Sequence, residues 1–351
     1  MIMKTAIIIL LCIGGLAGMC ALYLLVVAII PGFPVPRKPL GKRKKKTREL
    51  STRTSRERQN RSFEVNGATI NAWLYLPDNL NTPVPCIIMG HGAGGIRDMM
   101  LENYAMRFQD AGFAVLAFDY RHFGDSEGQP RNLIWIPYQL EDWSAAVAYT
   151  RSLDEIDQKR VAVWGTSLGG GHAIVTASKD KNIACVVAQC PGLDGRAGGE
   201  AFLKREGMGY LLRMIVHGQR DIVRSWLGLS PHKIPLVGKA GEVALMPTEN
   251  AYDLFKELAP ENFVNEVCAR IILRSGRYRP VKHAENVACP VLLQICDLDT
   301  ITPLSAARET EKNLGAHADV RHYPIGHFEI YSGENFETAV KDQLEFFKKH
   351  L

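Results

Sequence analysis

An apolar run that leads into a serine between two glycines is the feature that most limits what this chain can fold into. The run Val161–Trp164 continues as Gly165-Thr166-Ser167-Leu168-Gly169, and a helical pattern follows to residue 178. The glycines permit a sharp strand-to-helix turn, which presents the serine hydroxyl at the N-terminus of a helix. A serine needs a general base and an oxyanion stabiliser to act as a nucleophile. The stretch therefore predicts an α/β fold with Ser167 as a candidate nucleophile.

Short apolar runs alternate with helical patterns along most of the chain. The predicted strands are Cys86–Met89, Phe113–Phe118, Val161–Trp164, Ile183–Ala188 and Val291–Ile295. The predicted helices are Met99–Gln109, Pro137–Arg151, Leu168–Ser178, Leu304–Leu314 and Asn335–His350. This alternation predicts a mostly parallel sheet with helices on both faces. Ligands of such sheets bind at the carboxyl ends of the strands.

Two segments depart from the alternation. Residues 62–76 read as two strands joined at Asn66-Gly67, which is a hairpin signal. Residues 192–286 contain no clear strand pattern, although they include the apolar stretch Met208–Val216. We expect this insertion to form a mostly helical cap.

A second Gly-x-Ser-x-Gly sequence competes with the first. Gly124-Asp125-Ser126-Glu127-Gly128 also follows an apolar run, but Gln129-Pro130-Arg131 comes next and starts no helix. Two acidic residues also flank this serine. We interpret Ser126 as a loop residue.

From residue 62 onward the chain resembles the α/β-hydrolase family. The resemblance rests on motifs in a characteristic order: His91-Gly92-Ala93-Gly94-Gly95, Asp119 to Gly128, the turn at Ser167, Cys296 to Pro303, and Tyr323 to Phe328. The segment Gly67–Pro77 looks like the first hairpin of the branch that holds dienelactone hydrolases, serine aminopeptidases and X-Pro dipeptidyl-peptidases.

The resemblance implies roles for particular residues. Ser167 is the expected nucleophile, His327 the general base, and an acid orients the imidazole. The family spacing favours Asp299 over Asp297 as that acid. Backbone N–H groups of Ala93 and Leu168 are the expected oxyanion hole. Other histidines are less suitable by position: His172, His217, His232, His283 and His322. Asp119 and Arg121 are interpreted as structural.

The amino-terminal region has a composition of its own. Residues 1–61 hold 13 Lys and Arg against two acidic residues, while the other 290 residues carry 29 basic and 35 acidic ones. A basic body that would bind nucleic acid is therefore not expected. Residues 5–30 contain no charge and are long enough for a transmembrane helix, and they lack the cleavage site of a signal peptide.

These observations predict a transmembrane anchor over residues 1–30, a basic tether over 31–61 and a hydrolase domain over 62–351. The basic residues that follow the apolar run place the catalytic domain in the cytoplasm by the positive-inside rule, and they suit a surface of anionic lipid.

We thus expect a single-pass, membrane-anchored serine hydrolase that cleaves a carboxylic ester or thioester, with a lipid-like acyl substrate. The alternatives are an aminopeptidase or X-Pro peptidase on the same residues, acyl transfer to an alcohol, and a non-catalytic scaffold of hydrolase fold. No cofactor or metal is indicated, because no His, Cys or carboxylate cluster has metal-ligand spacing.

Overall fold

The computed structural model describes residues 2–29, 40, 58–78, 83–261 and 263–351. Its centre is an eight-stranded sheet in the order β1-β2-β4-β3-β5-β6-β11-β12. The strands are β1 (Gln59–Val65), β2 (Ala68–Tyr75), β3 (Val84–Gly90), β4 (Ala114–Phe118), β5 (Ile156–Thr166), β6 (Val186–Gln189), β11 (Val291–Cys296) and β12 (Ala318–Tyr323). β1 and β2 pair antiparallel with their neighbours, and the pairs from β4 to β12 are parallel.

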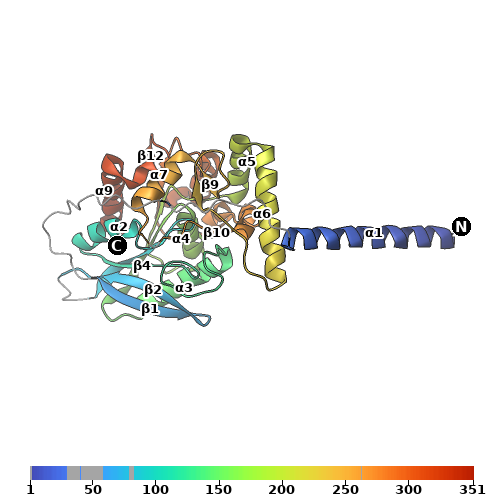
Figure 1. Ribbon diagram of the computed structural model, residues 1–351. Coiled ribbons are helices and arrows are strands. Elements are labelled where there is room, and N and C mark those ends of the chain that lie inside the picture. The colour runs from blue at the N-terminus through green and yellow to red at the C-terminus, as the bar shows by residue number, and fades with distance from the viewer. Residues whose placement is uncertain (1, 30–39, 41–57, 79–82, 262) are drawn as a thin grey trace.

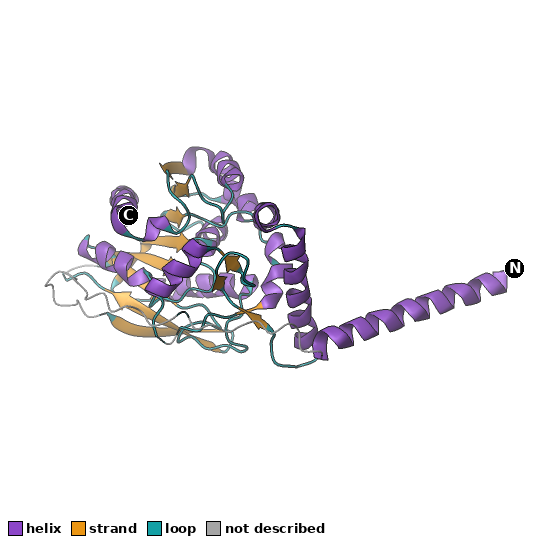
Figure 2. Ribbon diagram, turned by 45° about the horizontal axis from the view of Figure 1, so that its top comes forward, coloured by secondary structure: helices purple, strands orange, loops and turns teal. Residues whose placement is uncertain are grey.

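Helices cover both faces of this sheet (Figure 2). They are α2 (Leu101–Asp110), α3 (Ile136–Arg151), α4 (Leu168–Lys179), α8 (Leu304–Leu314) and α9 (Gly333–His350). α3 and α4 pack against each other and against β5, while α2 and α9 pack together over β4 and β11. Every residue of β4 and β11 is buried, as expected for parallel strands covered on both sides. The predicted mostly parallel α/β fold is confirmed.

The predicted hairpin is present and has a local cause. Asn66 and Gly67 both adopt positive φ, at 49° and 79°, between β1 and β2. A two-residue turn of this kind requires positive φ at both positions, which Asn-Gly supplies at low cost. Val65 consequently pairs with Ala68.

The insertion between β6 and β11 forms a cap beside the sheet. Its helices are α5 (Gly195–Glu206), α6 (Met208–Trp226) and α7 (Glu249–Leu258), followed by the 3₁₀ helices η1 (Ala269–Leu273), η2 (Ser275–Arg277) and η3 (Pro280–Asn286). It also contains four two-residue strands that the sequence pattern did not predict, β7 (Lys233–Ile234), β8 (Val237–Gly238), β9 (Met246–Pro247) and β10 (Val267–Cys268). Strands this short carry no readable alternation of polar and apolar residues. Two further 3₁₀ turns, η4 (Gly315–His317) and η5 (Glu329–Tyr331), flank β12.

The amino-terminal apolar segment forms helix α1 (Ile2–Ile29), but the prediction that it spans a membrane is wrong. Within the described part of the chain, no helix combines the length and the apolar content that a bilayer crossing requires. The prediction that the catalytic domain is cytoplasmic depended on this anchor and therefore loses its basis.

The end of α1 contacts the cap. Figure 1 shows α1 extending away from the body of the molecule, with its C-terminal end beside α6. The Tyr23 hydroxyl donates a hydrogen bond to Gln219 Oε1 of α6, and Val27 is buried. The predicted basic tether, residues 31–61, lies mostly outside the described residues, and β1 already begins at Gln59.

Candidate active site

Ser167 lies at the junction between β5 and α4, in a backbone conformation that few residues adopt. Its φ is 54° although it is not glycine, which is a strained geometry typical of functional turns. The neighbouring glycines permit it. A Cβ atom on Gly165 would lie 2.0 Å from the carbonyl oxygen of Gly169, and one on Gly169 would lie 2.4 Å from the carbonyl oxygen of His91. The Gly-x-Ser-x-Gly pattern thus follows from close backbone packing around the serine.

The loops after β11 and β12 bring an acid and a histidine to this serine. His327 Nε2 lies 3.1 Å from Ser167 Oγ, and His327 Nδ1 lies 2.6 Å from Asp299 Oδ2. The carboxylate can only accept, so Nδ1 carries the proton and donates it to Asp299. Nε2 is then left to accept the proton of the Ser167 hydroxyl.

Asp299 is held in place by its own loop. Its Oδ1 accepts hydrogen bonds from the backbone N–H groups of Ile301 (2.7 Å) and Thr302 (2.8 Å), and the Thr302 hydroxyl donates to Oδ2. Burial raises the pKa of this carboxyl, but His327 and the Thr302 hydrogen bonds outweigh burial and hold the pKa below its usual value. Asp299 is therefore ionised at neutral pH.

The pKa of His327 is displaced in the opposite direction. Burial lowers it, whereas the adjacent Cys190 and the Asp299 carboxylate raise it, and the net pKa lies above the ordinary value of 6.5. The paired carboxylate thus makes the imidazole a stronger base than a free histidine.

The competing candidates lie elsewhere. Asp297 accepts a hydrogen bond from His322 Nδ1 at 2.7 Å, near the surface. His172 Nδ1 lies 2.6 Å from the Tyr278 hydroxyl, and the His217 and His232 rings stack in the cap. Only His327, among the described histidines, is hydrogen-bonded to Ser167.

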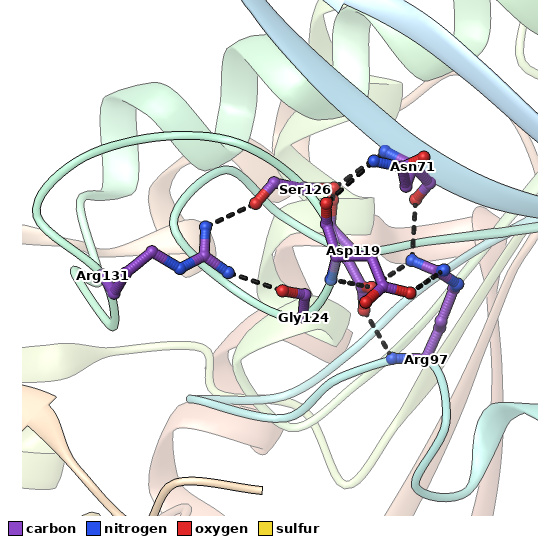
Figure 3. A network of polar contacts seen from close by, with 7 residues as sticks. Asn71, Arg97, Asp119, Gly124, Ser126 and Arg131 are labelled. Carbon is purple, nitrogen blue, oxygen red and sulfur yellow. Dashed lines mark hydrogen bonds and ion pairs between the residues drawn. The ribbon is translucent and has the colours of Figure 1, made fainter. Parts of the chain in front are cut away.

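Ser126, the serine of the second Gly-x-Ser-x-Gly sequence, is built into the protein interior. It is 1% exposed, and its hydroxyl donates to the Asp119 carbonyl oxygen and accepts from the Asn71 N–H, both at 2.8 Å (Figure 3). Both partners are backbone groups, so this hydroxyl supports the loop, as the sequence pattern predicts.

The two residues expected to supply the oxyanion hole lie beside the same cavity as Ser167. Ala93, Leu168 and Ser167 all line one cavity. Within the described ranges, neither the Ala93 nor the Leu168 N–H donates to a backbone carbonyl. Neither N–H group is therefore committed to a main-chain partner, which an oxyanion donor requires.

The cavity itself is mostly apolar and has a volume of about 280 Å³. Its walls come from residues around the start of α3, from the cap insertion, and from the loop that follows Asp299. They include Ile134, Ile136, Leu193, Phe202, Leu211, Met214, Leu245, Ile271, Ile272 and Tyr278. Sequence reasoning missed these residues, although the apolar stretch at the start of α6 supplies two of them, Leu211 and Met214.

One partly buried ion pair at the cavity edge was also missed, in which the aspartate is buried and the arginine is partly exposed. Asp194 Oδ2 accepts from Arg279 Nε (2.9 Å) and Nη2 (2.6 Å). Its Oδ1 accepts from the N–H groups of Arg196 and Ala197, so Asp194 caps α5. All of these partners are internal to the cap. Among the described residues, no cluster of three or more His, Cys, Asp or Glu side chains is arranged to hold a metal ion.

The fold and this site correspond to one class of protein. The family model for the alpha/beta hydrolase fold matches residues 85–216. A relative from Acinetobacter baumannii (strain MDR-ZJ06) is 43% identical over 291 residues, which is 82% of this chain and 93% of that protein. The chain belongs to the α/β-hydrolase fold family.

The relatives carry several functional names. The Acinetobacter relative is a "Quorum-quenching protein AidA". A "Thiohydrolase aneE" from Aspergillus aculeatus is 26% identical over 298 residues, 80% of this chain and 90% of that protein. Among solved structures, the α/β hydrolase GrgF from Penicillium sp. sh18 aligns with a TM-score of 0.70 at 23% identity, over 84% of this chain and 99% of that one, and shares the fold.

Proposed function

We propose that this protein is a serine hydrolase that cleaves an acyl ester or thioester through an acyl-enzyme on Ser167. His327 is the general base and acid, Asp299 orients and stabilises the imidazole, and the N–H groups of Ala93 and Leu168 stabilise the oxyanion. The observation that carries the proposal is the continuous chain of contacts from Asp299 through His327 to Ser167, which lines an apolar cavity.

In the first half of the reaction, Ser167 Oγ attacks the acyl carbonyl carbon while His327 Nε2 takes the hydroxyl proton. The carbonyl oxygen becomes negatively charged and accepts from the two backbone N–H groups. The tetrahedral intermediate then expels the alcohol or thiol, which leaves with the proton from His327. In the second half, water attacks the acyl-enzyme with His327 again as base, and the carboxylic acid leaves Ser167.

The lining of the cavity supports an apolar acyl group. Leu, Ile, Met and Phe side chains make up most of the wall beyond Ser167, and burial of such a group gains about 25 cal/mol for each Å² removed from water. Relatives named thiohydrolase support a thioester as one substrate form. The relative named as a quorum-quenching protein supports a small signalling molecule as the acyl donor.

The charges around the cavity favour this reading over a peptidase that binds a free amino terminus. Such a peptidase needs an unneutralised acid in the site. Asp194 is the carboxylate that lines the cavity in the described structure, and Arg279 neutralises it. The other acids considered in the cap are also paired, Glu200 with Arg196, Glu206 with Arg205 and Asp221 with Arg270.

A matched pair of serine variants tests the proposal. Ser167→Ala and Ser126→Ala each remove one hydroxyl from a Gly-x-Ser-x-Gly sequence. Hydrolysis of p-nitrophenyl esters and acyl thioesters of graded chain length, and labelling by a fluorophosphonate probe, are measured for both. We expect Ser167→Ala to abolish labelling and to lower kcat by about 10⁴–10⁶-fold, and Ser126→Ala to keep both.

Two other results would lead to different conclusions. Full labelling of Ser167→Ala would place the nucleophile elsewhere. Absence of labelling and hydrolysis in the folded wild-type protein would instead support the non-catalytic scaffold. Aminoacyl and X-Pro amides, assayed beside the esters, test the peptidase alternative.

A further inference from the structure

The loop that carries Ala93 is held at both of its ends by consecutive residues that follow β4. We call residues 91–97 the oxyanion loop. At its start, the Tyr120 hydroxyl donates to the His91 carbonyl oxygen at 3.1 Å. At its end, the Arg97 N–H donates to Asp119 Oδ1 at 2.7 Å. A loop tied at both ends keeps its backbone N–H groups in fixed directions, which is the requirement for a preorganised oxyanion hole.

Asp119 makes the stronger of the two connections. Its Oδ2 also accepts from Arg97 Nη1, so the same arginine is bound through backbone and side chain. Arg97 Nη2 donates to Asp125 Oδ2 at 2.6 Å, and the Asp125 N–H donates to Asp119 Oδ2 at 3.1 Å. Figure 3 shows Arg97 reaching from its loop to this carboxylate.

The Asp119 carboxylate has little freedom to move. It is 2% exposed and Arg97 is 5% exposed. A Cβ atom on Gly124 would lie 2.1 Å from Asp119 Oδ2, so the backbone of the loop after β4 closes over the carboxylate. Within the oxyanion loop, Gly94 packs closely on the cap, because a Cβ there would lie 2.5 Å from the side chain of Leu236. The oxyanion loop is thus fixed at Arg97 by Asp119 and packed at Gly94 against the cap.

We propose that Asp119, acting through Arg97, is a positioning residue that holds the oxyanion loop so that the Ala93 N–H faces the developing oxyanion at Ser167. This inference rests on the proposed function, because it assigns a task to the Ala93 N–H. Asp119, which we interpreted from the sequence as structural, then also affects catalysis.

Asp142 provides a matched control. It is also fully buried, and it also accepts from the backbone N–H (2.9 Å) and the side chain (2.6 Å) of one arginine, Arg121. Burial is the largest cause that raises the pKa of each carboxyl to about 6. The two carboxylates differ in location, since Asp142 ties Arg121 in the loop after β4 to α3, whereas Asp119 ties Arg97 at the end of the oxyanion loop.

The experiment compares Asp119→Asn and Asp142→Asn in the full-length protein. For each variant, kcat and KM are measured with a p-nitrophenyl ester. The inhibition constant is measured with an alkyl trifluoromethyl ketone, which forms a tetrahedral adduct on the serine. Thermal unfolding reports the stability of each variant.

We expect Asp119→Asn to lower kcat by about 10–100-fold with little change in KM, because one oxyanion donor is worth ~10²–10³ in kcat. Its affinity for the trifluoromethyl ketone should fall by a similar factor. Asp142→Asn should lose comparable thermal stability and keep both kcat and ketone affinity.

Equal losses of kcat in the two variants, or unchanged ketone affinity in Asp119→Asn, would overturn the inference and leave Asp119 a stabilising residue only. Ser167→Ala separates this failure from that of the proposed function. If Ser167→Ala is inactive while Asp119→Asn behaves like Asp142→Asn, the proposed function stands and the positioning role is wrong.

Discussion

The Nδ1 atom of His327 lies 2.6 Å from Oδ2 of Asp299, and this contact joins the two loops that follow the last two strands of the sheet. The two side chains are 28 residues apart in sequence and are both nearly inaccessible to water. A buried imidazole beside a buried carboxylate retains one tautomer, with the proton on the nitrogen that faces the acid. The contact therefore defines which nitrogen of His327 faces Ser167.

The first prediction separates the two aspartates at the end of β11. Asp299→Asn should lower kcat by about 10⁴-fold, because the amide favours the wrong tautomer of the histidine. Asp297→Asn should leave kcat close to that of the wild type, since Asp297 contacts His322 at the surface. Steady-state hydrolysis of a p-nitrophenyl ester measures both. A larger loss in Asp297→Asn would reverse the assignment of the acid.

The second prediction concerns pH. His327 acts as a base only when Nε2 is unprotonated, so kcat/KM should rise with pH through the pKa of this residue. Because Asp299 contributes to raising that pKa, the inflection should lie above 6.5 and should move to lower pH in Asp299→Asn. A profile of kcat/KM against pH, recorded for both proteins, checks this. An inflection that stays in place would mean that the carboxylate does not set the basicity.

The same raised pKa has a consequence for stability, with the opposite dependence on pH. Attraction between protonated His327 and Asp299 is fully present below the unfolded pKa of about 6.5 and is lost as the pH rises through the raised pKa of the folded state. The difference in Tm between wild type and Asp299→Asn should therefore shrink as the pH increases. Calorimetry at several pH values measures this difference.

The third prediction addresses the turn at Ser167. Gly165→Ala places a Cβ 2.0 Å from the Gly169 carbonyl oxygen, so the turn must shift, and we expect a loss of about 1–3 kcal/mol of stability together with most of the activity. Gly209→Ala is the control, because no atom lies within 4 Å of its Cβ and it is helical. That variant should gain up to ~1 kcal/mol. Urea unfolding compares the two, and an unaffected Gly165→Ala protein would contradict the packing argument.

The fourth prediction tests the cavity as the acyl site. Met214 is buried and lines the cavity, whereas Leu212 on the same helix is 55% exposed. Met214→Trp should lower kcat/KM for long-chain esters much more than for acetate esters, because the larger ring fills space that a long acyl chain needs. Leu212→Trp should preserve the chain-length preference. A uniform loss across all chain lengths in Met214→Trp would point to a general distortion of the site.

Features that depend on neighbouring residues could be predicted from the sequence. The turn at Ser167 depends on glycines two residues away on each side, and the hairpin at Asn66-Gly67 depends on two consecutive residues with positive φ. The parallel strands were recognisable because burial on both faces requires uninterrupted apolar residues. The four strands of the cap were missed because each contains only two residues.

The apolar segment at the amino terminus shows that composition alone does not predict what a helix packs against. Its residues form a helix, as their sequence suggests. However, no helix among the described residues has both the length and the apolar content that a membrane crossing requires. The contact between Tyr23 and Gln219 joins residues 196 positions apart. No local pattern indicates that the end of this helix packs on the cap.

The sequence by itself determined the order of the elements, the α/β class and the identity of the candidate nucleophile, because these follow from local backbone geometry and from the period of apolar residues. Only the tertiary structure decided that Asp299 rather than Asp297 contacts His327, that cap residues such as Met214 form the wall of the cavity, and that Asp119 binds the oxyanion loop. Each of these pairs residues from distant segments. Their distances are set by how helices and loops pack on the twisted sheet, and that packing depends on the whole chain.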